Sequence, residues 1–195
     1  MKPFLVLLLP FVLLGCGPEP DAPTEEALSA ALPEPVADAP NASPTTQADA
    51  IAAIKKLGGT VNLDKTSGEV VGVDLNYTQV TDAGLEHLKD LTSLTTLELY
   101  GTQVTDAGLE HLKDLTSLAM LYLSFTQITD AGLEHLQGLT SLTTLELTGT
   151  KITDVGLEHL QGLTSLTTLD LGSTPITDAG LAEIKAALPN CDILR

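Results

Sequence analysis

Histidine is the first residue type in this chain whose spacing suggests chemistry. The four histidines follow one another at intervals of 24 residues, and they are His87, His111, His135 and His159. Imidazole is a ligand that suits zinc, nickel and copper, so a regular array of rings could hold metal ions. Helices that carry such residues pack about 8–10 Å apart, however, which is too far for neighbouring rings to share an ion easily. We therefore interpret the histidines as copies of one repeated surface position, and we predict no metal site and no cofactor.

The other reactive side chains do not form a catalytic pattern. The repeated text contains no Ser–His–Asp order, no pair of catalytic carboxylates and no C-x-x-C motif. Cys191 lies in the apolar stretch L-P-N-C-D-I-L without a neighbouring base, so we predict a buried structural thiol and not a nucleophile. We expect that the chain is not an enzyme, and we identify no small-molecule substrate.

The charge of the chain limits its partners. Acidic residues number 26 against 9 basic ones, and the net charge is −17. Nucleic acids and anionic membrane surfaces need clustered lysine and arginine, so the composition argues against both. It suits a protein whose partners, where charge matters, are cations or basic surfaces.

The amino-terminal residues 1–15 have the features of a targeting segment. Lys2 is followed by an apolar run from Phe4 to Leu14, which is shorter than the roughly 20 residues that a membrane-spanning helix needs. The run ends in L-L-G-C, which resembles the lipobox of bacterial lipoproteins. That resemblance implies a lipoprotein signal peptide over residues 1–15 and lipidation of Cys16. An ordinary cleaved signal peptide and an uncleaved anchor remain the alternatives.

Residues 16–49 form the second segment, which is rich in proline, alanine and acidic residues and lacks basic ones. Such a composition cannot bury enough apolar surface to offset its ordering entropy, so we predict a disordered tether. The tether would hold a folded part away from the lipid, in the periplasm or at the cell surface of a bacterial envelope. In bacterial lipoproteins, Asp directly after the lipidated cysteine is a signal for retention in the inner membrane. Residue 17 is Gly, so we expect the outer membrane.

A repeat of 24 residues dominates the remainder, and its T-D aspartates are Asp82, Asp106, Asp130, Asp154 and Asp178. The pattern L-x-x-L-x-L-x-x-T-x-[VI] resembles the leucine-rich repeat, with Thr where that family most often has Asn. The following T-D-x-G-L-x-x-L resembles the cysteine-containing variant of the repeat, although the cysteine is absent. The resemblance covers residues 70–195 and implies an α/β fold: a right-handed solenoid with a parallel concave sheet and short convex helices.

The residue periods within one repeat predict the same elements. In L-T-T-L-E-L-Y, Leu97 and Leu99 alternate with polar residues, as in a strand with one buried face. Leu109, Leu112 and Leu115 recur at three, as in a short helix or 3₁₀ stretch, which Thr105 or Asp106 could cap. One such unit cannot bury its own apolar face, so neighbours must stack.

The repeat domain should extend over residues 50–195 and include a cap at each end. A helix over residues 48–58 and a hairpin that turns at K-T-S-G would form the first cap. A helix followed by a last strand would form the second, over residues 182–195.

Stacking converts each repeat position into a column. The threonines at positions 78, 102, 126, 150 and 174 should point inward and bond nearby backbone groups. The glycines at positions 84, 108, 132, 156 and 180 should allow close backbone packing.

The variable column on the concave face contains acids and one aromatic residue: Asp74, Glu98, Tyr122, Glu146 and Asp170. Four aromatic residues and one methionine occupy outward positions in the first three repeats, although an aliphatic core needs none of them: Tyr77, Tyr100, Met120, Tyr122 and Phe125. Such a patch between acids is typical of an interface hot spot. The alternative is sequence drift at solvated positions.

These patterns and the family resemblance predict a lipid-anchored, non-enzymatic module that binds a protein or peptide through its concave sheet. The expected binding residues are Asp74, Tyr77, Glu98, Tyr100, Met120, Tyr122, Phe125, Glu146 and Asp170. One alternative is a structural envelope protein that binds divalent cations through its acidic surface. Another is a regulatory subunit of an enzyme whose chemistry resides in a different chain.

Overall fold

A computed structural model describes residues 46–195 of the chain. The expected signal peptide, the lipidation site Cys16 and nearly all of the expected tether lie outside the described residues. The folded part begins slightly earlier than residue 50, because helix α1 (Gln47–Lys56) starts at Gln47. Thr46 and Asp49 form a capping box at this start, in which each side chain bonds the backbone of the other residue.

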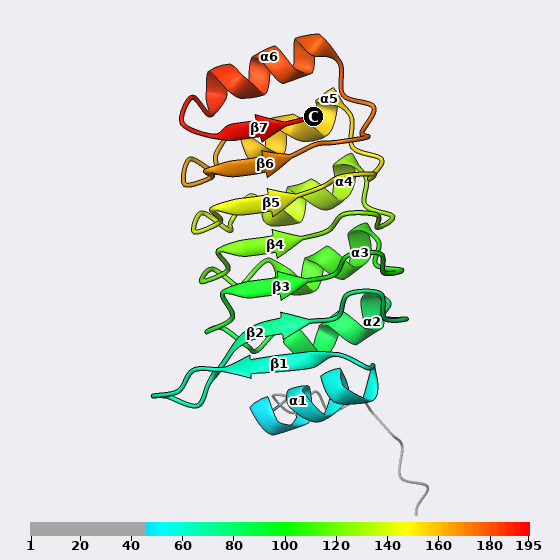
Figure 1. Ribbon diagram of the computed structural model, residues 1–195, viewed down its shortest axis with the longest axis vertical. Helices are drawn as coiled ribbons and strands as arrows, with labels where there is room; N and C mark the ends of the chain where they lie inside the picture. Colours follow the sequence, from blue (N-terminus) through cyan, green and yellow to red (C-terminus); the bar gives the residue numbers. More distant parts are fainter. Residues whose placement is uncertain (1–45) are drawn as a thin grey trace, which may run out of the picture. The chain divides into compact units, whose positions relative to one another are not determined.

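Helix α1 and a hairpin close the first end of the domain, as the sequence predicts. Ala50 and Ile54 face the core from α1. Strand β1 (Thr60–Leu63) pairs antiparallel with β2 (Val70–Asp74), and the turn between them contains Gly68 in a left-handed conformation. Figure 1 shows α1 beneath this hairpin at one end of the sheet.

The sheet has seven strands in the order β1 to β7, and all pairs from β2 onward are parallel. The repeats contribute β3 (Thr96–Glu98), β4 (Met120–Tyr122), β5 (Thr144–Glu146) and β6 (Thr168–Asp170). Strand β7 (Asp192–Leu194) comes from the predicted second cap. Residues 24 positions apart are direct partners across β2 to β6, so the register repeats with the sequence.

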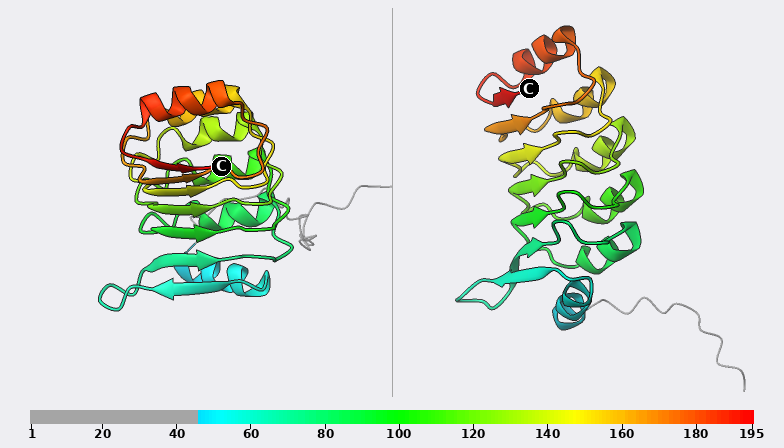
Figure 2. Two further views of the ribbon diagram at one scale, coloured as in Figure 1. Left: turned by 45° about the horizontal axis from the view of Figure 1, so that its top comes forward. Right: turned by 45° about the vertical axis from the view of Figure 1, so that its right-hand side comes forward.

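Each repeat returns to the sheet through one turn of α-helix followed by one turn of 3₁₀-helix. The pairs are α2 (Asp82–Leu85) with η1 (Glu86–Leu88), α3 (Asp106–Leu109) with η2 (Glu110–Leu112), α4 (Asp130–Leu133) with η3 (Glu134–Leu136) and α5 (Asp154–Leu157) with η4 (Glu158–Leu160). Helix α6 (Asp178–Ala187) is longer and closes the second end. Figure 2 shows the strands along one side of the domain and these helices along the other. The predicted leucine-rich-repeat architecture is therefore confirmed.

The core is a stack of aliphatic side chains between the two layers. Leu97 and Leu99 of one repeat and Leu121 and Leu123 of the next are fully buried. No aromatic side chain within residues 46–195 is buried. The aromatic residues therefore have another reason for their positions.

The inward threonine column behaves as expected. The hydroxyls of Thr102, Thr126 and Thr150 donate to the carbonyl oxygen three residues earlier, at distances of 2.8, 2.6 and 2.7 Å. These three threonines are buried, and their hydroxyls satisfy strand-end carbonyls that the neighbouring strand does not reach.

The helix side contains hydrogen bonds that the sequence analysis did not anticipate. Asp106 accepts from the backbone N–H of Thr129 at 2.7 Å and from its hydroxyl at 2.6 Å. The same pair of bonds joins Asp82 to Thr105, Asp130 to Thr153 and Asp154 to Thr177. We call this series the Asp–Thr ladder.

The ladder corrects the expected helix cap. The hydroxyl of Thr105 accepts no hydrogen bond from α3, and it donates to the carboxylate of Asp82 in the preceding repeat. Thr153 and Thr177 donate to the preceding repeat and also accept from an N–H of their own helix. The carboxylate of Asp106 is likewise turned to the next repeat.

The ladder also explains the glycine column more specifically than close backbone packing. A Cβ placed on Gly132 would lie 2.4 Å from the Oδ1 atom of Asp106. Gly108, Gly156 and Gly180 face the aspartate of their preceding repeat in the same way. Glycine is required there because the carboxylate occupies the space of a side chain.

Candidate binding face

The predicted binding residues lie on the face of the sheet that points away from the helices, here called the outer face. Strand pairing places Glu98 beside Tyr122 and Tyr122 beside Glu146, with Asp74 and Asp170 at the two ends of this row. All five side chains are half-buried. We call the four acids the carboxylate column, which Tyr122 interrupts at its centre.

Three of the four predicted aromatic side chains contact one another. The ring centroids of Tyr77 and Tyr100 are 5.0 Å apart, and those of Tyr100 and Phe125 are 5.2 Å apart. The interplanar angles of 57° and 56° correspond to the tilted geometry that aromatic pairs prefer. These residues form the aromatic row, which crosses three consecutive repeats where the strands end.

The fourth aromatic residue belongs to a different group. The hydroxyl of Tyr122 lies 3.7 Å from the Sδ atom of Met120 on the same strand. Tyr122 is therefore the centre of the carboxylate column, with Met120 beside it, and is not a member of the aromatic row. The patch that the sequence predicts as one unit thus consists of two adjoining groups.

The backbone under the aromatic row has an unusual conformation. Tyr77, Gly101, Phe125, Gly149 and Ser173 occupy one column, and their φ angles are 55°, 66°, 56°, 68° and 56°. Only glycine adopts this left-handed region without a steric cost, which for other residues is about 1–2 kcal/mol. Tyr77 and Phe125 therefore hold bulky side chains where the fold itself favours glycine.

The aromatic residues and glycines of this column are matched in pairs. A Cβ on Gly149 would lie 2.8 Å from two ring carbons of Phe125, and one on Gly101 would lie 3.2 Å from the ring of Tyr77. Each ring thus extends over the glycine of the following repeat. Their exposed fractions remain large, at 74% for Tyr77 and 51% for Phe125.

Asn76 joins the aromatic row to the carboxylate column. Its side-chain nitrogen donates to Oε2 of Glu98 at 2.5 Å, and its Oδ1 atom accepts from the backbone N–H of Tyr100 at 2.9 Å. Asn76 was not among the binding residues predicted from the sequence. The sequence could have indicated it, because Asn76 is the one asparagine in a column that otherwise holds Tyr100, Ser124, Thr148 and Gly172.

Ser124 is the second residue of the face that the sequence analysis did not assign. Its carbonyl accepts from Gly101, which places it beside Tyr100 in the same column. The side chain is 1% exposed, and its Oγ atom has no hydrogen-bond partner within residues 46–195. A buried polar atom without a partner is costly and rare.

The carboxylates of the face repel one another. Burial, followed by the charges of Asp170 and Glu98, raises the pKa of Glu146. Burial, followed by the charges of Glu146 and Glu98, raises the pKa of Tyr122. Within the described part of the chain, none of the four column acids forms an ion pair.

The column acids differ in their hydrogen bonds. Asp74 and Asp170 each accept from a backbone N–H two residues later, at 2.9 and 2.8 Å. The side chain of Glu146 has no hydrogen-bond partner among the described residues, so its carboxylate is the most available acceptor on the face.

Other reactive residues do not assemble into a site. Residues 46–195 contain no group of three or more His, Cys, Asp and Glu side chains that could hold a metal ion. His159 pairs with Gln137 instead, at 2.5 Å between the two side-chain nitrogens.

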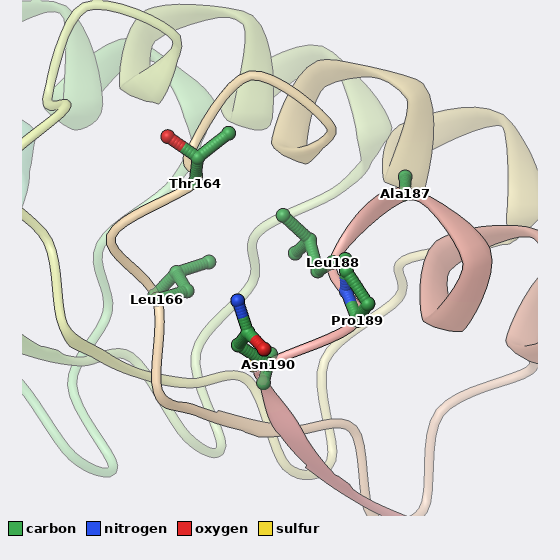
Figure 3. A pocket seen from close by; sticks show the side chains of 7 residues that line it. Thr164, Leu166, Ala187, Leu188, Pro189 and Asn190 are labelled. Atoms are coloured by element: carbon green, nitrogen blue, oxygen red, sulfur yellow. The ribbon is translucent and has the colours of Figure 1, made fainter.

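Cys191 is only half-buried, which corrects the expectation of a buried thiol. It directly precedes β7, the edge strand of the sheet, and its side chain packs partly against the core. Burial and the charge of Asp192 raise the pKa of its thiol, so it is a poor nucleophile. It lines a pocket of about 190 Å³ together with Leu166, Leu188 and Asn190. Figure 3 shows this small pocket between α6 and the preceding repeat.

Comparison with known protein families agrees with this geometry. Residues 90–113 and 117–176 match families described as leucine-rich repeat. The chain carries a leucine-rich-repeat fold. None of the curated proteins compared with the sequence matches it.

Two solved leucine-rich-repeat structures illustrate the likeness. An internalin from Listeria monocytogenes is 28% identical with a TM-score of 0.55, over 76% of this chain and 42% of the internalin. The ectodomain of the Arabidopsis receptor kinase HAESA, solved with an extended IDA peptide hormone, is 17% identical with a TM-score of 0.53. That match covers 76% of this chain and 33% of the ectodomain, and it shows the fold alone. This chain therefore spans less than half of either protein.

Within residues 46–195, every helix is too short or too polar to cross a membrane.

Proposed function

We propose that this chain is a non-enzymatic protein-binding module whose partner docks on the outer face. The observation that carries the proposal is the position of Phe125. This residue keeps a bulky ring in a left-handed backbone conformation where two other repeats have glycine, and half of the side chain is exposed. Strained residues that the core does not need are concentrated at binding sites.

The surroundings of Phe125 support the same function. Tyr, Phe and Met are enriched at the centres of protein interfaces, and here they gather on one face of an otherwise aliphatic protein. Leucine-rich-repeat proteins typically act by binding, and the HAESA ectodomain is one that holds a peptide.

The proposal includes an anchor in the bacterial cell envelope. Cys16 would carry the lipid, and the acidic segment after it would hold the binding module away from the membrane. Metabolic labelling with a fatty acid tests this part: the unaltered protein should be labelled and sediment with membranes, and Cys16→Ser should be unlabelled and soluble. A labelled Cys16→Ser protein would show that the anchor lies elsewhere.

A photo-crosslinking experiment tests the binding face. A photoreactive phenylalanine analogue replaces Phe125 in one variant and Val155 in another, since Val155 is a 64% exposed apolar residue on the helix side. In the native envelope, the first variant should yield a discrete crosslinked protein and the second should not. Equal crosslinking from both positions would contradict a specific outer-face partner.

A triple variant supplies the quantitative test. Met120→Thr, Tyr122→Glu and Phe125→Gly introduce residues that the repeat at positions 144, 146 and 149 already has, so the fold should be retained. Loss of hot-spot residues should weaken capture of the crosslinked partner by about thirtyfold or more. Unchanged capture by the folded variant would mean that these residues arose by drift.

The cation-binding alternative has less support. Tyr122 separates Glu98 from Glu146, so neighbouring strands do not bring three carboxylates together. A calcium titration tests this alternative. If calcium raises the melting temperature of the triple variant and of the unaltered protein equally, the cation binds outside this face.

A further inference from the structure

The outer face contains unmatched negative charge beside exposed rings. Asp74 and Asp170 have local backbone donors, and Glu98 has Asn76, but Glu146 has no side-chain partner within residues 46–195. The ion pairs of the described residues lie elsewhere, at Glu86 with Lys89, Glu110 with Lys113 and Asp178 with Arg195. A partner that docks on this face must therefore supply the positive charge.

An unpartnered polar atom lies in the same face. The Oγ atom of Ser124 is buried, and Ser124 lies between Tyr100 of the neighbouring repeat and Phe125, the next residue, whose rings contact each other. Both rings belong to partly exposed side chains, so a change of rotamer can give a ligand access to this oxygen. The hydroxyl of Ser124 can both accept and donate, and a ligand N–H group is one partner that would satisfy it.

Two requirements follow for the ligand: positive charge for Glu98 and Glu146, and a flat surface for the rings. N–H groups would in addition satisfy Ser124. A guanidinium group meets both requirements and also supplies the N–H groups, because it is cationic, planar and carries five donors in a fixed plane. An ammonium group supplies charge and donors but does not stack on rings. A divalent cation would need a cluster of ligands, and residues 46–195 have none.

We infer that the outer face binds an arginine side chain of its protein partner, between the carboxylates of Glu98 and Glu146 and against the rings of Tyr122, Tyr100 and Phe125. This inference depends on the proposed function and specifies the chemistry of the partner. Glu98 and Glu146 lie on either side of Tyr122, on strands that are two spacings of about 4.8 Å apart. A guanidinium over Tyr122 would therefore have one carboxylate on each side.

The experiment uses three short probes on the folded protein. The probes are acetyl-Gly-Arg-Gly-amide, its lysine analogue and its citrulline analogue, which has nearly the shape of arginine without the charge. Tyrosine and phenylalanine ring signals are followed by NMR during each titration. The arginine probe should shift the Tyr122, Tyr100 and Phe125 signals to saturation, and the citrulline probe should bind about tenfold more weakly because it lacks the charge. Equal binding of the lysine probe would overturn the guanidinium assignment.

Variants of two carboxylates and one hydroxyl locate the site. Glu146→Gln should weaken the arginine probe by about fivefold to tenfold, whereas Glu158→Gln, an exposed control on the helix side, should leave it unchanged. Ser124→Ala should also weaken the probe, by about threefold to tenfold, without lowering the melting temperature of the free protein. A Ser124→Ala protein that binds the probe normally would remove Ser124 from the site.

The outcomes separate this inference from the proposed function. If the photoreactive residue at position 125 captures a partner but the arginine probe shifts none of the ring signals, the binding face stands and the arginine assignment is wrong. If neither the crosslink nor the probe binding is observed, both are wrong.

Discussion

The phenyl ring of Phe125 lies so close to Gly149 that a Cβ on that glycine would be 2.8 Å from Cδ1 and Cε1 of the ring. The two residues occupy equivalent positions in successive repeats, and both have positive φ angles. The ring of one repeat therefore rests on the backbone of the next, which is possible only because the next repeat has no side chain there. An aromatic residue at this position therefore requires glycine in the next repeat, so at most every second copy can be aromatic.

Replacement of Gly149 should disturb this arrangement in two ways. Gly149→Ala places a Cβ against the ring and in a left-handed conformation, so we expect the free energy of unfolding to fall by at least about 1 kcal/mol. The control is Gly162→Ala, because an added Cβ at Gly162 meets no atom within 4 Å. Urea unfolding measures both variants. If the two variants were equally stable, neither the contact with the Phe125 ring nor the positive φ angle would require glycine at position 149.

Substitutions of Phe125 itself should follow an unusual order. Phe125→Ala removes the ring but keeps a Cβ at φ 56°, whereas Phe125→Gly removes both the ring and the strain. We expect the glycine variant to be more stable than the alanine variant by about 1 kcal/mol, the reverse of the order in helices. A more stable alanine variant would mean that the left-handed conformation of this column is not required by the fold.

This strain explains why the fold was easier to predict than the site. The positions of Leu97, Leu99 and their equivalents follow from a period that five copies repeat, so strands, helices and register could be derived directly. Gly101 and Gly149 suggest a positive φ angle at their column of the repeat. Tyr77 and Phe125 occupy the same column, and because bulky residues rarely adopt a positive φ angle, the sequence did not predict it there. Residue type indicated an exposed patch, but it did not indicate the left-handed backbone conformation of Tyr77 and Phe125.

Contacts between repeats account for the other differences. The Asp–Thr ladder joins residues 23 positions apart, and the sequence alone offered each Thr a nearer partner in its own helix. Ser124 carries no sequence signal at all, because its residue type does not show that its side chain is buried without a hydrogen-bond partner. Cys191 was expected to be buried because of its apolar neighbours, but it lies at the edge of the sheet, where it is half-exposed.

Removal of one ladder carboxylate should weaken the contact between two repeats. Asp106→Ala eliminates two charge-assisted hydrogen bonds to Thr129, and we expect the free energy of unfolding to fall by about 2–4 kcal/mol. Asp114→Ala, at an exposed position on the same side, should change it by less than about 0.5 kcal/mol. If both variants unfold at the same urea concentration, the ladder contributes nothing measurable to stacking.

The buried leucine column permits a severe test of the register. Leu123 is fully buried, and Leu123→Asp would place an unpaired carboxylate in an aliphatic core, which we expect to cost several kcal/mol. Tyr122→Asp, one residue earlier on the outer face, should cost only about 1 kcal/mol, mainly from repulsion by Glu98 and Glu146. Melting temperatures of the two variants, measured in the same buffer, should therefore differ widely. A similar decrease for both would contradict the alternation of inward and outward residues in β4.

The two sides of the solenoid should respond to pH in opposite directions. The hydroxyl and backbone N–H of Thr177 hold the pKa of Asp154 below its usual value of 3.8, so the stability from this contact is present at neutral pH and is lost as the pH falls through the lowered pKa. Burial and the neighbouring acids raise the pKa of Glu146 above 4.5, so its ionised form destabilises the fold once the pH rises through that raised value. Asp154→Asn should therefore lower the melting temperature at pH 7 by an amount that shrinks as the solution becomes more acidic than about pH 3.8. Glu146→Gln should raise the melting temperature at pH 7 and have little effect below about pH 4, where the carboxyl group is protonated in both the folded and unfolded states. A Glu146→Gln protein that melts lower than the unaltered one at pH 7 would show that the carboxylate has a stabilising partner, and the unmatched charge on the outer face would then be absent.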